Sequence, residues 1–152
     1  MDIDDVVSGV RSLADAGRID PDRVAIRGGS AGGYTVLRAL TTSTVFAAGT
    51  SYFGISDLAV LLVDDHKFES RYTTTLVGPW PEAASVYRER SPVHHVADLH
   101  GQVLLLQGAD DLVVPVAQAQ LMADAMRAAG KQVDRVVDEA EGHGFRQAPT
   151  II

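Results

Sequence analysis

The stretch RVAIRGGSAGGY, residues 23–34, places four glycines and one serine between a short apolar run and a segment with helical spacing. Val24, Ala25 and Ile26 form a continuous apolar run, which is typical of a strand buried on both faces. Glycine loses more conformational freedom on folding than any other residue, so four glycines in six positions indicate a local requirement. Three requirements fit: a cradle for phosphate, a tight structural turn, or a nucleophile displayed on a strained bend.

The two familiar phosphate-binding motifs do not fit this stretch. A dinucleotide fingerprint that begins at Gly28 requires glycine at position 30, where Ser30 stands. A P-loop that begins at Gly28 requires lysine after Gly33, where Tyr34 stands. The sequence therefore disfavours a nucleotide, and we expect no cofactor.

The remaining match is G-x-S-x-G, formed by residues 28–32. In a nucleophile elbow the serine sits on a sharp bend between strand and helix, and small residues on either side prevent a steric clash. We expect Gly28 and Gly32 to serve this purpose, Ser30 to be the nucleophile, and the Ala31 N–H to face a developing oxyanion. The alternative is a tight turn in which Ser30 only caps the helix, and the pentapeptide alone does not decide between them.

Composition sets the class of protein. The chain of 152 residues is 46% hydrophobic and 22% charged, as expected for one globular domain rather than a disordered chain. Its net charge of −7 disfavours a nucleic-acid partner, and the absence of cysteine excludes disulfides and thiolate chemistry. The acidic start MDIDDVV is unlike a secretory signal, and no apolar run is long enough to span a membrane. A cytoplasmic location is the default expectation.

Strand and helix patterns alternate along the chain. We expect helices over 2–17, 34–40 and 115–130, a short helix that begins at Trp80 with Pro81 in its first position, and strands over 24–26, 45–54, 102–108 and 132–137. Residues 57–100 show no strand pattern. The alternation predicts an α/β fold: a mostly parallel sheet of about four strands, with helices on both faces, in a single domain over residues 1–152.

Two further residues complete a candidate catalytic set. On the fold that carries this elbow, the order along the chain is serine, then acid, then histidine, each on a loop after a strand. Asp111 follows the strand over 102–108, and His143 follows the strand over 132–137. From the residues alone Asp110 stays open as the acid, in which case the other aspartate caps the helix near Pro115.

Other candidates are weaker. Asp57 is a distant third choice for the acid. His66, His94, His95 and His100 lie in or at the exit of the strand-poor stretch, where surface or hydrogen-bonded roles are commoner. His94 and His95 with Asp64 and Asp65 match no metal-ligand spacing, so no metal is expected. The aromatic candidates for a substrate pocket are Tyr34, Phe53, Phe68, Tyr72 and Trp80, although core packing is the commoner fate of such side chains.

Taken together, RVAIRGGSAGGY, SYFGISDL, HKFESRY, LLLQGADDLVVP and EGHGF resemble the catalytic domain of the prolyl oligopeptidase family of serine peptidases, in its dipeptidyl- and acylaminoacyl-peptidase-like branch. The resemblance extends over nearly the whole chain. It implies an α/β-hydrolase fold with Ser30 as nucleophile, Asp111 as acid and His143 as base. The family pattern G-x-x-D-x-x-V-P falls on Asp111, Val114 and Pro115, which favours Asp111 over Asp110.

The chain also departs from the family pattern. The strands before the first helix, the His-Gly-Gly segment and tyrosine that supply a second oxyanion donor, the β-propeller, and a helix after the histidine have no counterpart here. The chain therefore looks like the C-terminal part of a larger enzyme. The strand at the elbow would lack a partner on one side, and an unpaired edge favours self-association or pairing with a complementary segment.

The sequence thus predicts a serine peptidase or related hydrolase that cleaves a peptide near its N-terminus, or a small ester or amide, through an acyl-enzyme on Ser30. Neither nucleic acid nor a membrane is an expected partner. The alternative is a non-catalytic or weakly active hydrolase fragment that serves as a subunit or binding module.

Overall fold

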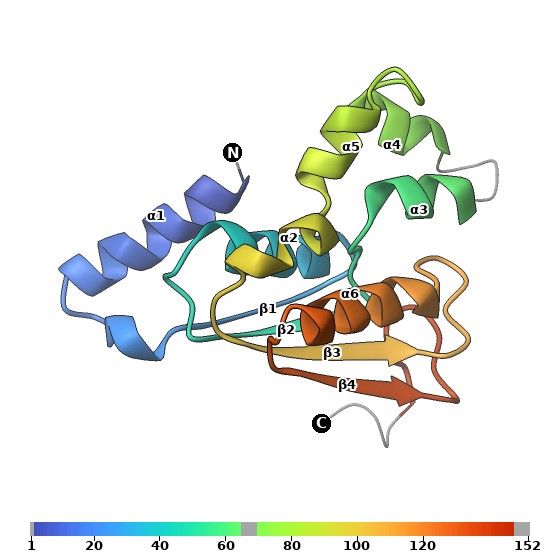
Figure 1. The fold of residues 1–152 in the computed structure, drawn as a ribbon. Helices are drawn as coiled ribbons and strands as arrows, with labels where there is room; N and C mark the ends of the chain where they lie inside the picture. Colours follow the sequence, from blue (N-terminus) through green and yellow to red (C-terminus); the bar gives the residue numbers. More distant parts are fainter. Residues whose placement is uncertain (1, 65–69, 148–152) are drawn as a thin grey trace.

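The computed structural model describes residues 2–64 and 70–147 (Figure 1). Four strands form the sheet: β1 (Ala25–Gly29), β2 (Ala48–Tyr52), β3 (Gln102–Gly108) and β4 (Val133–Asp138). The helices are α1 (Asp2–Asp15), α2 (Ala31–Thr42), α3 (Leu58–Asp64), α4 (Ser70–Val77), α5 (Ala84–Arg90) and α6 (Val116–Ala128), with short 3-10 segments η1 (Pro21–Arg23) and η2 (Pro92–Asp98).

The sheet is parallel throughout, and its strands follow the order β1-β2-β3-β4. This confirms the predicted α/β class and the four parallel strands. Because every strand runs the same way, all four carboxyl ends lie at one edge of the sheet. The segments that follow β1, β3 and β4 carry Ser30, Asp111 and His143, respectively.

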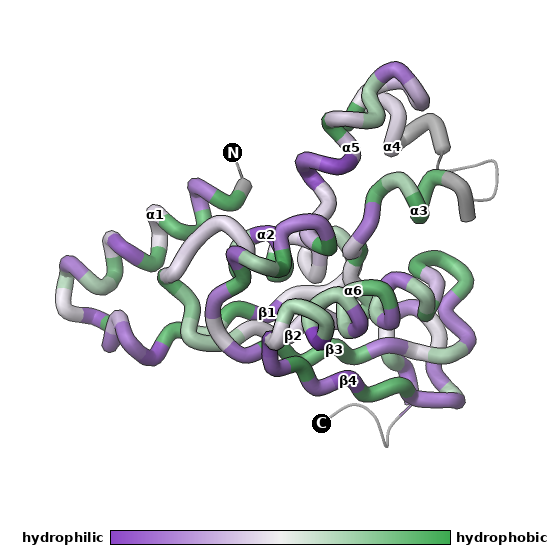
Figure 2. The backbone as a smooth tube through the Cα atoms, viewed as in Figure 1, coloured by the Kyte–Doolittle hydropathy of each residue, from purple (hydrophilic) through white to green (hydrophobic). Residues whose placement is uncertain are grey.

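Helices α2 and α6 cover the sheet and form the core with it. Helix α2 packs on β1 and β2, helix α6 packs on β3 and β4, and α1 packs on α2. Figure 1 shows these helices above the sheet in that view. The core comprises Val7, Val36, Leu37, Ala39, Leu40, Phe46, Leu99, Val103, Leu105, Met122, Ala123 and Met126. In Figure 2, α1 alternates between hydrophilic and hydrophobic segments, as expected for a helix with one face against α2.

Glycines end two helices as the sequence indicates. Gly17 has φ +66° after α1, and Gly130 has φ +71° after α6, a conformation that suits glycine because it lacks Cβ. After α6, the Lys131 N–H donates to the Met126 carbonyl at 2.8 Å, which closes the last turn.

Several predicted boundaries are wrong. Helix α2 begins at Ala31 rather than at 34, directly after the bend. Strand β2 is shorter than 45–54 because Phe53 leaves the extended region with φ +39°. The short helix begins at Ala84 instead of at Trp80, because the carbonyl groups of Pro79 and Pro81 accept hydrogen bonds within a turn that precedes it.

The stretch between β2 and β3 is helical, and its described residues contain no strand. Figure 1 shows α4 and α5 rising away from the sheet. Within the described parts of the chain, no helix is long and apolar enough to cross a membrane.

Candidate active site

Ser30 occupies the bend between β1 and α2 in a strained backbone conformation. Its φ is +56° and its ψ is −120°, a region that non-glycine residues rarely adopt. The Ser30 N–H donates to the Tyr52 carbonyl at 3.0 Å, which ties the bend to the end of β2. The side chain makes no cap hydrogen bond to α2, so the interpretation of Ser30 as a simple helix cap is wrong.

Close backbone packing explains two of the glycines. A Cβ on Gly28 would lie 2.5 Å from the Gly32 carbonyl oxygen, and a Cβ on Gly33 would lie 2.7 Å from Gly54 Cα. Glycine at these positions lets α2 pass close to the ends of β1 and β2. The expectation for Gly32 is wrong, because a Cβ there would meet no neighbouring segment within 4 Å.

Asp111 lies in the loop after β3, and its side chain is completely buried. The Oδ1 atom accepts hydrogen bonds from the backbone N–H groups of Val113 at 2.9 Å and Val114 at 2.8 Å. The Oδ2 atom accepts from Gln107 Nε2 at 3.1 Å and lies 2.9 Å from His143 Nδ1. A buried carboxylate needs such donors because it has lost its water.

His143 connects the other two residues. Its Nδ1 faces Asp111 Oδ2 at 2.9 Å, and its Nε2 lies 3.1 Å from Ser30 Oγ. An ionised carboxylate only accepts hydrogen bonds, so Nδ1 carries the proton in the neutral imidazole and Nε2 accepts from the serine hydroxyl. The imidazole is 23% exposed, which leaves it accessible from one side. Ala31 begins α2, so its N–H belongs to the first turn, whose donors have no acceptor within the helix.

Phe53 packs on the imidazole and belongs to a cluster of three aromatic side chains with Tyr52 and Phe145. The Phe53 ring centroid lies 4.6 Å from that of His143 and 5.3 Å from that of Phe145. Tyr52 contacts both phenylalanines edge-on. A Cβ on Gly29 would lie 2.9 Å from the Phe53 ring, so this ring fills the space between the elbow and the imidazole.

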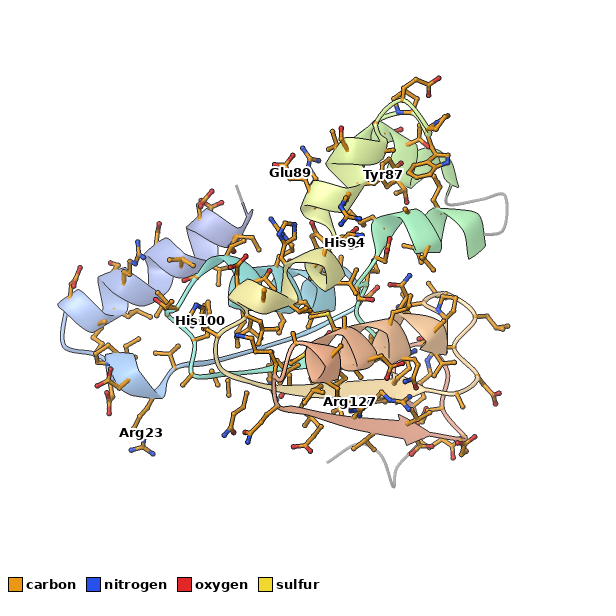
Figure 3. The ribbon with its side chains drawn as sticks, in the orientation of Figure 1. Arg23, Tyr87, Glu89, His94, His100 and Arg127 are labelled. Carbon is orange, nitrogen blue, oxygen red and sulfur yellow. The ribbon has the colours of Figure 1, made fainter. Side chains whose placement is uncertain are left out.

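The remaining aromatic candidates do not join this group. Among the described residues, Trp80 packs edge-on against Tyr87 of α5 and is 44% exposed, whereas the Tyr34 hydroxyl donates to the Arg90 carbonyl at 2.9 Å. Figure 3 labels Tyr87 near α4 and α5. Phe68 lies outside the described residues, as does the side chain of Tyr72.

The alternative acids have other roles. Asp110 is exposed, its N–H donates to the Glu141 carbonyl at 3.0 Å, and α6 begins without a side-chain cap. The prediction that the aspartate which is not the acid caps this helix is therefore wrong. Asp57 Oδ1 instead accepts from the N–H groups of Ala59 and Val60 at the start of α3, and its Oδ2 lies 3.5 Å from His94 Nε2.

The other histidines belong to the fold. His95 Nε2 bonds to the Glu89 carbonyl at 2.7 Å, and His100 lies two residues before β3, toward the amino ends of the strands (Figure 3). His66 lies outside the described residues. Within residues 2–64 and 70–147, no three histidine, aspartate or glutamate side chains gather as a metal site requires.

Two buried polar residues at the site were missed by sequence reasoning. Glu141 accepts from the N–H groups of Arg146 at 2.8 Å and Gln147 at 2.7 Å, so it closes the loop that carries His143. Gln107 donates to Asp111 from β3. Glu141 stands two residues before His143 in EGHGF, but spacing does not reveal which polar side chains turn inward.

A parallel sheet with a serine at its strand–helix bend, followed in the chain by an aspartate and a histidine that contact one another, defines the α/β-hydrolase class. The model of the prolyl oligopeptidase family matches residues 1–152, so the chain belongs to this family.

Individual relatives agree with this assignment. The chain is 34% identical over 148 residues to dipeptidyl aminopeptidase BIII of Pseudoxanthomonas mexicana, covering 93% of this chain and 22% of that protein. It is 32% identical over 128 residues to a probable carboxylic ester hydrolase of Mycobacterium tuberculosis, covering 74% of this chain and 30% of that protein. The solved structure of a puromycin-hydrolysing peptidase of Mycobacterium tuberculosis superimposes with a TM-score of 0.95 at 46% identity, covering 98% of this chain and 23% of that one. The chain thus spans less than a third of the length of these relatives.

Proposed function

We propose that this chain carries the catalytic residues of a serine hydrolase of the peptidase type, with Ser30 as nucleophile, His143 as general base and Asp111 as the acid that orients the imidazole. One observation carries the proposal: a single imidazole lies 2.9 Å from a buried carboxylate and 3.1 Å from a serine hydroxyl on a strained bend. Both distances lie within the hydrogen-bond range expected for a nucleophile, its base and the acid that orients the base, which supports the proposal.

In the acylation step, Ser30 Oγ attacks the carbonyl carbon of the substrate while His143 Nε2 takes the hydroxyl proton. The carbonyl oxygen becomes an oxyanion, and the Ala31 N–H at the start of α2 donates to it. The imidazolium then gives its proton to the leaving amine or alcohol, and the carbonyl carbon–leaving group bond breaks. The substrate acyl group is left as an ester on Ser30.

In the deacylation step, water attacks the same carbonyl carbon and gives a proton to His143 Nε2. The ester bond to Ser30 breaks, the imidazolium returns the proton to Oγ, and the carboxylic acid product leaves. Asp111 stays ionised throughout and stabilises the imidazolium through its hydrogen bond to Nδ1.

The substrate we propose is a peptide cleaved near its N-terminus, or a small ester or amide. The names of a dipeptidyl aminopeptidase, a puromycin-hydrolysing peptidase and a carboxylic ester hydrolase among the relatives support this range. Phe53 is a candidate for the pocket wall because its ring contacts the base, and Tyr34 because it follows the nucleophile by one helical turn.

A weakly active or non-catalytic fragment is the second candidate. It is kept because the chain covers only 22% of the dipeptidyl aminopeptidase and 23% of the puromycin-hydrolysing peptidase. Strand β1 forms one edge of the described sheet, and we propose that this edge pairs with a second copy or a complementary segment.

Hydrolysis of an aminoacyl nitroanilide and of a nitrophenyl ester tests the proposal. We expect release of the chromophore that is abolished by Ser30→Ala and unchanged by Ser8→Ala, a substitution at an exposed serine of α1. Equal rates in the parent chain and Ser30→Ala would overturn the proposal. Light scattering on the same samples would show whether activity accompanies a dimer or a monomer.

A further inference from the structure

Gln107 occupies the penultimate position of β3, and its side chain is completely buried. Its Nε2 lies 3.1 Å from Asp111 Oδ2 and 2.9 Å from the Val114 carbonyl oxygen, with the Gly108 carbonyl oxygen at 3.4 Å. The amide thus joins the strand to both the start and the end of the loop that carries the acid.

The orientation of this amide is determined by its neighbours. All three atoms around Nε2 are oxygens that accept hydrogen bonds, so the nitrogen and not the oxygen must face them. The other end of the amide, Oε1, is buried and has no hydrogen-bond partner among the described residues. An unsatisfied buried acceptor destabilises the fold, so stability alone gives little reason for glutamine over an apolar residue of the same length.

The carboxylate of Asp111 is satisfied on both oxygens. Oδ1 accepts the two backbone N–H groups of the loop, and Oδ2 is shared between Gln107 Nε2 and His143 Nδ1. These two donors hold Oδ2 in place from two directions. They also compete for the negative charge on this oxygen.

We propose that Gln107 is a positioning residue for the Asp111–His143 pair: its amide holds Oδ2 in the place where Nδ1 meets it and withdraws part of the carboxylate's charge from the imidazole. The inference rests on the proposed function for its catalytic consequence. The structural part of the inference is that a buried amide acts on the imidazole through a shared carboxylate oxygen. This part depends on the hydrogen bonds alone.

Removing the amide has a definite electrostatic consequence. Without the N–H dipole, Oδ2 presents more negative charge to His143, and the protonated imidazole becomes more favourable. Asp111 is the charged group that contacts the ring, and Glu141, the other acid packed in the same loop, is occupied by two N–H groups of that loop. The pH at which the His143 ring protonates is therefore expected to rise when the amide is removed.

The chain supplies a matched control in Gln118 of α6. This glutamine is also completely buried, and it lies beside a second aspartate–histidine pair, Asp57 and His94. Its side-chain amide, however, bonds to the backbone of Asp57 and to the backbone N–H and hydroxyl of Ser56 rather than to a carboxylate oxygen. Loss of Gln118 removes buried hydrogen bonds without altering the charge that faces an imidazole.

The experiment follows the ring ¹H–¹⁵N resonances of His143 and His94 against pH in the parent chain, Gln107→Met and Gln118→Met. We expect Gln107→Met to raise the midpoint of the His143 titration and to leave that of His94 unchanged. We expect Gln118→Met to lower the melting temperature more and to move neither midpoint. A His143 midpoint that stays within about 0.2 units in Gln107→Met, or that moves equally in Gln118→Met, would overturn the proposal.

A second measurement keeps the proposal testable if Gln107→Met does not fold. In the parent chain, the Nε2 protons of Gln107 share Oδ2 with His143, so their resonances must shift with the same midpoint as the His143 ring. Protons that do not respond to this titration would refute the proposal. Neither readout requires turnover, so an inactive chain with coupled resonances would count against the proposed function and not against the role of Gln107.

Discussion

The Nε2 atom of His143 lies 3.1 Å from the Oγ atom of Ser30, although 113 residues separate them in the chain. Ser30 follows β1 and His143 follows β4, which are the two edge strands of the sheet. The contact therefore spans the carboxyl ends of β2 and β3. The Phe53 ring, placed by a backbone with φ +39° at the end of β2, lies against the imidazole between these edges.

We expect Asp111→Asn to lower the rate of covalent modification of Ser30 by roughly 10⁴-fold. The two N–H groups at Oδ1 keep the amide oxygen there, so the amide nitrogen faces Gln107 Nε2 and His143 Nδ1, which are donors. The imidazole must then move its proton to Nε2, where it no longer accepts from Ser30.

Asp110→Asn is the control for this substitution, since it alters the adjacent and exposed carboxylate. Its rate of modification by a fluorophosphonate is expected to stay within about threefold of the parent, because a screened surface charge contributes little. Equal losses in the two variants would contradict the assignment of the acid.

Gly28→Ala and Gly32→Ala form a second pair within one motif. The Cβ of Gly28→Ala would overlap the Gly32 carbonyl oxygen, at 2.5 Å, so we expect a loss of about 2 kcal/mol or more in the free energy of unfolding. Gly32→Ala places its Cβ in open space on a helix and is expected to raise that free energy by up to about 1 kcal/mol. Urea denaturation measures both, and a larger loss in Gly32→Ala would show that the packing of the bend is misassigned.

The loop around His143 depends on the buried carboxylate of Glu141. Glu141→Gln replaces one acceptor oxygen with a donor that faces a backbone N–H, so we expect a loss of about 1.5 to 3 kcal/mol in the free energy of unfolding. The exposed Glu139→Gln is the control and is expected to change it by less than about 0.5 kcal/mol. If calorimetry and denaturation find both variants equally stable, Glu141 does not hold the loop.

The positions of Ser30, Asp111 and His143 could be predicted because they depend on topology more than on side-chain detail. Residues that directly follow parallel strands meet at one edge of the sheet. Three short motifs in the right order along the chain were therefore enough to predict that these three residues lie close together. The strained φ of Ser30 was likewise expected from the requirements of a sharp strand–helix bend.

The remainder of the site depends on which side chains turn inward, and spacing does not report this. Gln107 and Glu141 are polar residues in segments where exposed polar residues are common, and only the packed loops show that both are buried. Gly32 occupies the same kind of position in the motif as Gly28, but a Cβ at Gly32 would meet no neighbouring segment within 4 Å. Of the aromatic candidates for the substrate pocket, Phe53 packs on the imidazole, whereas Trp80 packs against Tyr87 of α5.

Intact mass after treatment with a fluorophosphonate tests the central claim most directly. We expect one adduct on the parent chain and none on Ser30→Ala, because only a serine with an assembled base attacks this reagent readily. Ser8→Ala, at an exposed serine, is expected to be labelled like the parent chain. A folded parent chain without an adduct, or equal labelling of the parent chain and Ser30→Ala, would contradict the account.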